Sequence, residues 1–267
     1  IMGLHLEGHY FNMVMAGGQL PENIKNPDPD EYIPLLEETN CIKRWDAAPE
    51  LPGAIEFGRH ITSKGVLASI GHTKAEYGDV LAAYNAGYSH ATHFYNAMPG
   101  FHKRGEYKYE GTVESIYLFD DMTVELVADG IHVPAPILRM VHKIKGVENT
   151  ALITDALACA ASDSQVAFDP RVIIEDGVCK LADRSALAGS IATMDRLLRT
   201  MVFKADIPLQ DAVRMSSETP ARIMGILDRK GTLEKGKDAD IVMYNKALEV
   251  QCVWSMGKIV EGTNKLG

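Results

Sequence analysis

Carboxylate and imidazole side chains stand at the ends of several strand-like runs of this sequence. Glu7 ends the first run, His72 follows the third and His93 lies in the fourth. One carboxylate and two imidazoles form a ligand set typical of a catalytic zinc ion, with one coordination position left open for water. The sequence therefore predicts a metal-dependent hydrolase site that is built on these three residues.

A further carboxylate, Asp155, ends the sixth run directly after Thr154. A carboxylate beside a metal-activated water can accept its proton and later return it, so we interpret Asp155 as a general acid/base. Asp129 and His132 close the fifth run in the same way. Taken singly, such residues are more often packing histidines or helix caps, but their repetition at strand ends favours a shared site.

The strand-like runs alternate with helical patterns, which predicts parallel strands joined by helical crossovers. The expected strands are residues 1–8, 42–50, 66–71, 89–94, 123–128 and 151–154. The expected helices are residues 29–39, 52–64, 75–86, 136–145, 193–204, 209–215 and 220–224. An open doubly wound sheet and a closed barrel both fit this alternation. In a barrel, the carboxyl ends of all strands face one mouth, where active sites are built.

Six βα units are two fewer than a closed barrel contains, and the chain begins within a strand-like run. We therefore expect an α/β fold, a TIM-like (β/α)8 barrel truncated at its N-terminus, in residues 1–228. The alternating tail, residues 229–267, is expected to form part of a small β-sandwich. Residues 166–181 predict a hairpin, and residues 100–109 a charged loop.

The overall composition narrows the classes of partner. The formal net charge of -9 argues against general binding of nucleic acid or of anionic membranes. The four cysteines form no CxxC pair, and no run of about 18 apolar residues is present. We therefore expect a cytoplasmic protein with reduced thiols that acts on a small molecule.

Seven segments follow one another along the chain as motifs, namely Gly3-Leu4-His5-Leu6-Glu7-Gly8, Ala48-Pro49-Glu50, Gly71-His72-Thr73, Ala91-Thr92-His93-Phe94-Tyr95-Asn96-Ala97-Met98-Pro99, Ala128-Asp129-Gly130-Ile131-His132, Leu152-Ile153-Thr154-Asp155-Ala156 and Leu187-Ala188-Gly189-Ser190. In these segments and in their order, the sequence resembles the N-acetylglucosamine-6-phosphate deacetylases of the amidohydrolase superfamily. A tail segment, residues 231–242, is similar to one shared across the superfamily.

The resemblance implies an enzyme of amino-sugar metabolism that converts N-acetylglucosamine 6-phosphate to glucosamine 6-phosphate and acetate. It implies one or two divalent metal ions, with zinc expected and iron, cobalt or manganese also suitable, and it gives Asp155 the acid/base role. The substrate contacts that it implies are Gly18, Gln19, Asn96, Ala97, His132, Leu187, Ala188 and Gly189. It further implies a homodimer in which Arg104 reaches the phosphate in the neighbouring site.

Several alternatives remain at this stage. The substrate can be the galactosamine isomer or another cyclic amide, although a dihydroorotase-like site would need a lysine at a strand end. The chain can also be an inactive truncated remnant. Arg104 can be plain surface charge, and Ser190 can cap the following helix. His9 stands where the family usually has proline and can add an imidazole to the site, whereas His5 is expected in the core.

Overall fold

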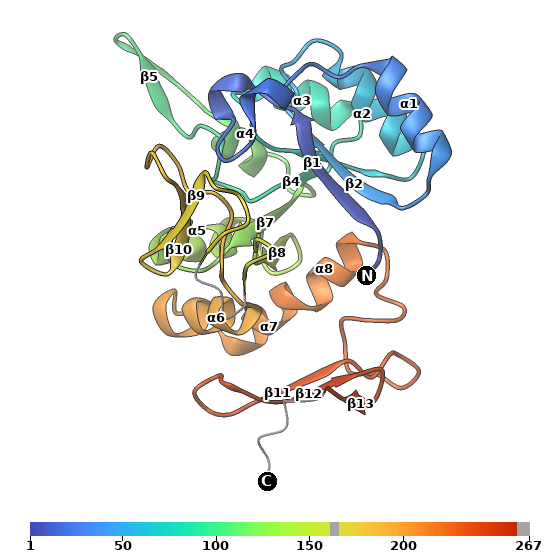
Figure 1. The fold of residues 1–267 in the computed structure, drawn as a ribbon, viewed down its shortest axis with the longest axis vertical. Coiled ribbons are helices and arrows are strands. Elements are labelled where there is room, and N and C mark those ends of the chain that lie inside the picture. Colours follow the sequence, from blue (N-terminus) through green and yellow to red (C-terminus); the bar gives the residue numbers. More distant parts are fainter. Residues whose placement is uncertain (161–165, 261–267) are drawn as a thin grey trace. The chain divides into compact units, whose positions relative to one another are not determined.

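The computed structural model (Figure 1) describes residues 1–160 and 166–260. The chain divides into two units. The first unit comprises Ile1–Leu126 and Asp169–Gly189. The second comprises Val127–Phe168 and Ser190–Gly267. The predicted boundary at residue 228 stays a prediction, and residues 261–267 of the predicted C-terminal domain lie outside the described residues.

A parallel sheet forms the centre of the first unit. Its neighbouring strands run in the order β1 (Leu4–Tyr10), β2 (Ile42–Ala47), β3 (Leu67–Ile70), β4 (His90–Ala91) and β7 (Thr123–Val127), and the last residue of β7 belongs to the second unit. Every pairing in this series is parallel. A helix follows each of the first four strands: α1 (Pro29–Glu38), α2 (Ala54–Ser63), α3 (Tyr77–Asn85) and α4 (Thr112–Tyr117). The predicted βα alternation is confirmed here.

Helix α2 illustrates how the sequence determines the packing of these helices. Its buried residues Ala54, Phe57, Gly58 and Ile61 follow the spacing of one helical face, and the helix packs against β3 and α3 (Figure 1). A Cβ atom at Gly58 would lie 2.1 Å from the ring of Tyr88, so only glycine admits this ring against the helix.

The second unit contains one further strand of the predicted series, β8 (Thr150–Ile153), after helix α5 (Ala135–Lys145). Three more helices follow: α6 (Met194–Arg199), α7 (Leu209–Ser216) and α8 (Glu218–Ile223). The predicted helix of residues 193–204 is interrupted, because a π-helical turn, Thr200–Lys204, replaces its second half. None of the helices in the described ranges is long and apolar enough to span a membrane.

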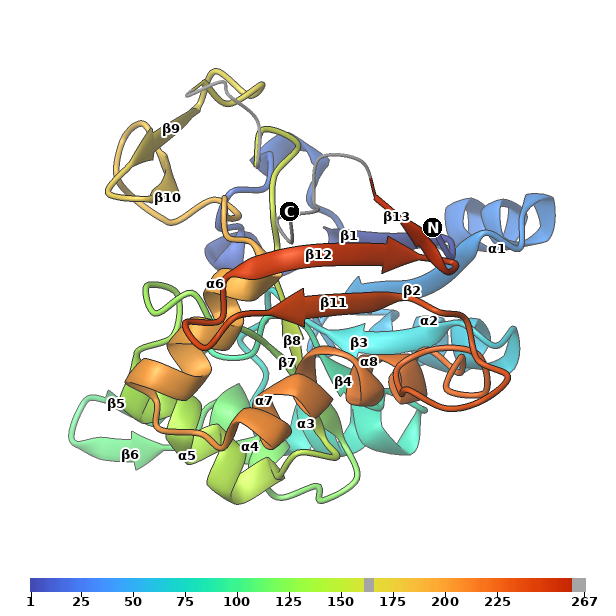
Figure 2. The ribbon, with the colours of Figure 1, turned by 90° about the horizontal axis from the view of Figure 1, so that it is seen from below.

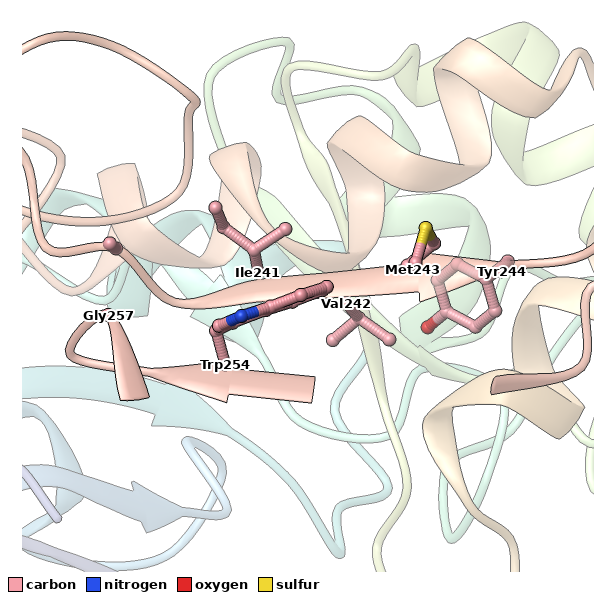
Figure 3. A pocket seen from close by; sticks show the side chains of 7 residues that line it. Ile241, Val242, Met243, Tyr244, Trp254 and Gly257 are labelled. Atoms are coloured by element: carbon pink, nitrogen blue, oxygen red, sulfur yellow. The ribbon is translucent and has the colours of Figure 1, made fainter. Parts of the chain in front are cut away.

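The tail of the second unit forms a small antiparallel sheet, and its place in a β-sandwich stays a prediction. Its strands are β11 (Ile241–Tyr244), β12 (Val250–Ser255) and β13 (Lys258–Ile259), drawn in red in Figure 2. A hollow of about 620 Å³ lies on this sheet. Figure 3 shows its mostly apolar lining, including Ile241, Val242, Met243, Tyr244 and Trp254.

Two predicted segments differ from the observed fold. The expected charged loop of residues 100–109 is a hairpin, formed by β5 (His102–Arg104) and β6 (Tyr107–Tyr109) around Gly105 at φ 62°. The fourth strand ends at Ala91 rather than Phe94, because His93 has φ 30° and cannot continue a strand. The predicted hairpin in residues 166–181 is present as β9 (Val172–Glu175) and β10 (Val178–Leu181).

Candidate active site

Three side chains converge in the first unit, and we call Glu7, His72 and His93 the triad. His72 and His93 each lie two residues after the end of their strands, β3 and β4, whereas Glu7 lies in the middle of β1, which continues to Tyr10 beyond the predicted end of the strand. His72 Nε2 lies 2.9 Å from Glu7 Oε1, and His93 Nε2 lies 3.1 Å from the same oxygen. The two Nε2 atoms are 3.1 Å apart. Both histidines are only 5% exposed. The structure therefore brings together the three residues that the sequence predicted as metal ligands.

The donor atoms of the triad fit a divalent cation. Two ligand atoms that each lie about 2.1 Å from one ion are about 3.0 to 3.4 Å apart when the angle between the bonds is 90 to 109°. The observed separations of 2.9 to 3.1 Å are close to this range. Among the described residues, the triad is the one group of three or more potential ligands with this convergence.

The charge on Glu7 also suits a metal ligand. Burial by itself would raise the pKa of this carboxyl, but hydrogen bonds and charge interactions with His72 and His93 outweigh it and hold the pKa well below its ordinary value. Glu7 is therefore ionised at neutral pH, as a metal ligand must be.

The ring of His72 is oriented by the loop that follows β1. Its Nδ1 lies 2.7 Å from Met15 O. Because a carbonyl oxygen only accepts, Nδ1 carries a hydrogen, which leaves Nε2 as the ring nitrogen that would bind a metal ion. The ring of Phe11 stacks on the imidazole of His72, with 4.2 Å between the ring centroids, and this contact fixes the plane of the imidazole.

Backbone strain gathers around the two histidines. His72, Tyr95 and Ala97 have φ values of 48°, 79° and 49°, in the left-handed region that residues with a side chain rarely adopt. Such strained residues concentrate at functional sites. The loops that follow β3 and β4 are also tied together, because Thr73 N donates to Ala97 O at 3.0 Å.

Two predicted substrate contacts, Asn96 and Ala97, lie in the loop directly after His93. Asn96 holds that loop closed, since both its backbone N and its Nδ2 donate to His93 O, at 2.8 and 3.0 Å. Of the pair, Ala97 supplies the carbonyl that accepts from Thr73. Both residues thus lie beside His93 of the triad, and their contact with a substrate stays a prediction.

The predicted contacts Gly18 and Gln19, and those in residues 187–189, belong to two segments that meet. A Cβ atom at Gly18 would lie 3.2 Å from the Cβ of Ala188, and one at Gly17 would lie 3.4 Å from His72 Cε1. Gln19 N donates to Ala16 O, and Leu187 forms a bridge to Lys180. Gly189 has φ 64°. The sequence missed Arg171, whose Nη2 donates to Gly18 O at 3.2 Å.

Asp155 and His132 belong to the second unit and are described within it. Asp155 has φ 49°, and its carbonyl accepts a hydrogen bond from Ser190 N at 2.7 Å. Ser190 Oγ donates to Thr154 O, so this segment is fixed to the end of β8. The alternative interpretation of Ser190 as the cap of the next helix is wrong, because Thr193 is the N-cap of α6.

His132 is held by a carboxylate of its own loop. Its Nδ1 lies 2.9 Å from Asp129 Oδ2, and Asp129 Oδ1 accepts from the backbone N of Ile131 and His132. Burial would raise the pKa of Asp129, but these hydrogen bonds lower it below its ordinary value. The ionised carboxylate thus fixes the plane of the imidazole.

Three other expectations can be compared with observed contacts. Arg104 forms an ion pair with Glu76 at 3.0 Å and lies 3.5 Å over the ring of Tyr109. His9 Nε2 lies 2.9 Å from Glu31 Oε1, so its imidazole is directed to Glu31 and not to the triad. The prediction that His5 is in the core is wrong, because its side chain is 36% exposed and reaches Asp46 from outside.

A further group that the sequence patterns did not predict is the buried ion cluster, namely Arg44, Asp46, His90 and Glu125. Arg44 Nη1 and Nη2 donate to the two oxygens of Glu125 at 2.6 and 2.5 Å, and Arg44 Nε donates to Asp46 Oδ1 at 3.3 Å. His90 Nε2 lies 3.2 Å from Glu125. The available signal was charge inside apolar strands, because Arg44 and Asp46 lie within β2 and Glu125 within β7.

A model of the amidohydrolase family matches residues 50–260, which is more than half of the chain. The chain belongs to the amidohydrolase family. The convergence of the triad on the parallel sheet agrees with this membership. The family model does not by itself identify a substrate.

Within the family, the chain is similar to deacetylases of amino-sugar phosphates, which confirms the predicted resemblance. It is 34% identical to the N-acetylglucosamine-6-phosphate deacetylase of Bacillus subtilis, over 97% of this chain and 65% of that protein. It is 32% identical to the N-acetylgalactosamine-6-phosphate deacetylase of Escherichia coli O157:H7, over 97% of this chain and 68% of that protein. The chain thus spans about two thirds of the length of these relatives.

A solved structure gives the same result for the fold. A mutant of the N-acetyl-D-glucosamine-6-phosphate deacetylase of Mycobacterium smegmatis, in complex with N-acetyl-D-glucosamine-6-phosphate, matches with a TM-score of 0.90 and 32% identity. The match covers 97% of this chain and 68% of that one. The parallel α/β fold of this amidohydrolase is therefore shared, while closure of a complete barrel stays a prediction.

Proposed function

We propose that this chain carries the catalytic centre of a deacetylase that hydrolyses N-acetylglucosamine 6-phosphate to glucosamine 6-phosphate and acetate. The observation that carries the proposal is the triad, a buried carboxylate and two imidazoles whose ligand atoms lie 2.9 to 3.1 Å apart. The names of the relatives supply the substrate class.

The triad would hold a divalent metal ion, for which zinc is the first choice and iron, cobalt or manganese are alternatives. When bound, such an ion lowers the pKa of water and polarises a carbonyl oxygen. Glu7 contributes the negative charge of the ligand set, and His72 contributes a ring nitrogen whose lone pair is directed by Met15 O.

Asp155 is proposed as the group that moves the proton. Its carboxylate accepts a proton from water as the water oxygen bonds to the acetyl carbon. It then delivers that proton to the nitrogen as the C–N bond breaks, so that acetate and the free amine form. Its fixed backbone supports this role, because Ser190 N holds the Asp155 carbonyl.

The remaining residues are proposed to bind the substrate. Asn96 and Ala97 lie beside His93, and Gly18 lies against Ala188, so these loops offer contacts around the triad. Gln19, Leu187 and Gly189 belong to the same two segments, and His132 presents an imidazole that Asp129 fixes. We also propose a cytoplasmic homodimer in which Arg104 contacts the phosphate in the neighbouring site.

Asp155→Asn tests the mechanism. We expect the deacetylation rate to fall at least about 100-fold, because general acid/base catalysis contributes about 10² to 10⁴, while the zinc content stays unchanged. Asp228→Asn is the matched control, since Asp228 lies outside the site, after the last helix of the second unit. Activity near the wild-type rate in Asp155→Asn would contradict the mechanism.

A second candidate substrate, N-acetylgalactosamine 6-phosphate, is supported by the similarity to the Escherichia coli relative. The two sugars differ at one hydroxyl group. Measuring kcat/KM for both decides between them, and the preferred sugar should lead by at least about tenfold, the effect of about 1.4 kcal/mol in the transition state. If neither sugar is hydrolysed and the chain holds no zinc, it is an inactive remnant.

A further inference from the structure

Glu50, between β2 and α2, accepts three hydrogen bonds from two separate loops. Its Oε1 accepts from Asn12 Nδ2 at 3.0 Å and from Lys74 N at 2.6 Å. Its Oε2 accepts from Thr73 Oγ1 at 2.5 Å. Glu50 is half-buried and is not one of the converging ligands of the triad. Its partners nevertheless all adjoin His72, because Asn12 N donates to His72 O and Thr73 and Lys74 directly follow it.

The first connection runs through the loop after β1. Asn12 Oδ1 accepts from Val14 N at 3.0 Å and thereby begins a single 3-10 turn, Met13–Met15. The carbonyl of Met15, at the end of this turn, is the group that orients His72 Nδ1. Asn12 N also donates to His72 O at 2.9 Å. By holding the Asn12 amide, Glu50 fixes the start of the turn that orients the His72 ring.

The second connection runs through the loop after β3. Thr73 and Lys74 are the two residues that follow His72, and Glu50 binds the hydroxyl of the first and the backbone N–H of the second. His72 itself has φ 48°, a conformation that needs support from its surroundings. Glu50 thus restrains both the backbone of His72 and the loop that directs its ring.

We propose that Glu50 is a positioning residue of the metal centre, which holds His72 Nε2 toward Glu7 through Asn12 and through the backbone after His72. Groups that orient a metal ligand through hydrogen bonds typically change metal affinity or activity about 10- to 100-fold when they are removed. The inference rests on the proposed function only in assuming that the triad binds a metal.

The test compares Glu50→Ala, Glu50→Gln and Asp121→Ala in the whole chain. Asp121 is the matched control, because both of its carboxylate oxygens share the hydrogen that Tyr84 Oη donates from another element, at 2.9 and 2.8 Å, and neither residue contacts His72. The zinc dissociation constant is measured by competition with a chromophoric chelator. We expect it to rise about 10- to 100-fold in Glu50→Ala, and about threefold or less in Asp121→Ala.

Glu50→Gln should recover most of this loss, since its amide oxygen still accepts from Asn12 Nδ2 and Lys74 N. A purely structural role would lower the metal-free unfolding midpoint of Glu50→Ala without the selective loss of zinc affinity. Equal zinc affinity in Glu50→Ala and Asp121→Ala would overturn the proposal. If Glu50→Ala does not fold, Asn12→Ala replaces it, with a rise of about three- to tenfold expected because one of the two connections remains.

A second readout needs no metal. Amide hydrogen exchange of the metal-free protein reports both connections, because Val14 N donates to Asn12 Oδ1 and Lys74 N donates to Glu50 Oε1. Glu50→Ala should speed exchange at both amides relative to wild type, and unchanged exchange at Val14 would overturn the proposal. If wild type binds no zinc or hydrolyses neither sugar, the proposed function fails, while this measurement still decides the role of Glu50.

Discussion

The triad and the buried ion cluster lie in the same unit and use the same residue types, but their polar atoms are arranged differently. In the triad, two ring nitrogens and one carboxylate oxygen converge within 3.1 Å of one another. In the buried ion cluster, the guanidinium of Arg44 lies among the acceptors of Asp46, Thr92 and Glu125. In the buried ion cluster the protein itself supplies the cation, the guanidinium of Arg44. In the triad, the ligand atoms suit a cation that is not part of the chain.

This difference separates a structural cluster from a binding site. The guanidinium of Arg44 is a rigid planar group that donates to several acceptors at once. The two carboxylate oxygens of Glu125 accept hydrogen bonds from Arg44 Nη1 and Nη2. In the triad, the ligand atoms of Glu7, His72 and His93 lie close enough together to bind one ion. Histidine and glutamate near strand ends therefore indicate a metal only when no arginine lies among them.

The largest expected effect comes from breaking the buried ion cluster. Arg44→Met should lower the free energy of unfolding by about 3 to 5 kcal/mol, because it leaves the buried carboxylates of Glu125 and Asp46 without their cation. Urea unfolding of the metal-free protein measures this. A loss below about 1 kcal/mol would show that the cluster is not stabilised by charge pairing, and Arg59→Met, at an exposed arginine, provides the control.

Breaking the triad should act on metal affinity instead. Glu7→Gln is expected to weaken zinc binding at least about 100-fold, or about 2.7 kcal/mol, because it removes the anionic ligand. The metal-free stability should change less than in Arg44→Met. Equilibrium dialysis against zinc measures the affinity, with Glu37→Gln as an exposed control. Unchanged zinc affinity in Glu7→Gln would remove Glu7 from the ligand set.

The pH dependence of stability sharpens the comparison further. Burial would raise the pKa of Glu125, but the charge of Arg44 and the contact with His90 outweigh it and hold the pKa well below its ordinary value. A carboxyl with a lowered folded-state pKa contributes stability above its unfolded value, about 4.3, and loses it as the pH falls through the folded value.

The urea midpoint of the wild type should therefore fall as the pH drops from about 5 to 3, and it should fall less steeply in Glu125→Gln. Parallel curves for the two proteins would mean that other carboxylates carry the acid sensitivity.

The smallest effect is expected on the exposed hairpin. Arg104→Ala should change the free energy of unfolding by less than about 1 kcal/mol, because its ion pair with Glu76 is largely exposed. If Arg104 serves a neighbouring site, the KM for the sugar phosphate rises while kcat is kept. Lys108→Ala, in the other strand of the hairpin, should leave KM unchanged.

The sequence predicted the strands, most of the helices and the triad because these leave local signals. Alternating apolar runs mark strands, and a polar residue directly after a buried strand points to the mouth of the sheet. Contacts between distant residues leave no such signal. The pairing of Arg44 with Glu125 joins residues 81 apart, and the partners of Glu50 lie 23 to 38 residues away.

The exposed hairpin and His5 were misjudged for a related reason. In residues 100–109, charged side chains predicted a solvated loop, yet the strands pair through their backbones and need no apolar face. His5 was assigned to the core from its place in β1, but among the described strands β1 pairs only with β2, and the side chain of His5 is partly exposed.

The three ligands of the triad are far apart along the chain, with separations of 65, 21 and 86 residues. A cation bound to all three would close these loops as a covalent cross-link does. We expect the ligands to meet only after β1, β3 and β4 have formed, because each ligand lies within or just after one of these strands. A metal ion that binds only the folded site would leave the refolding rate unchanged and slow unfolding, and it would thereby protect the native chain against proteolysis.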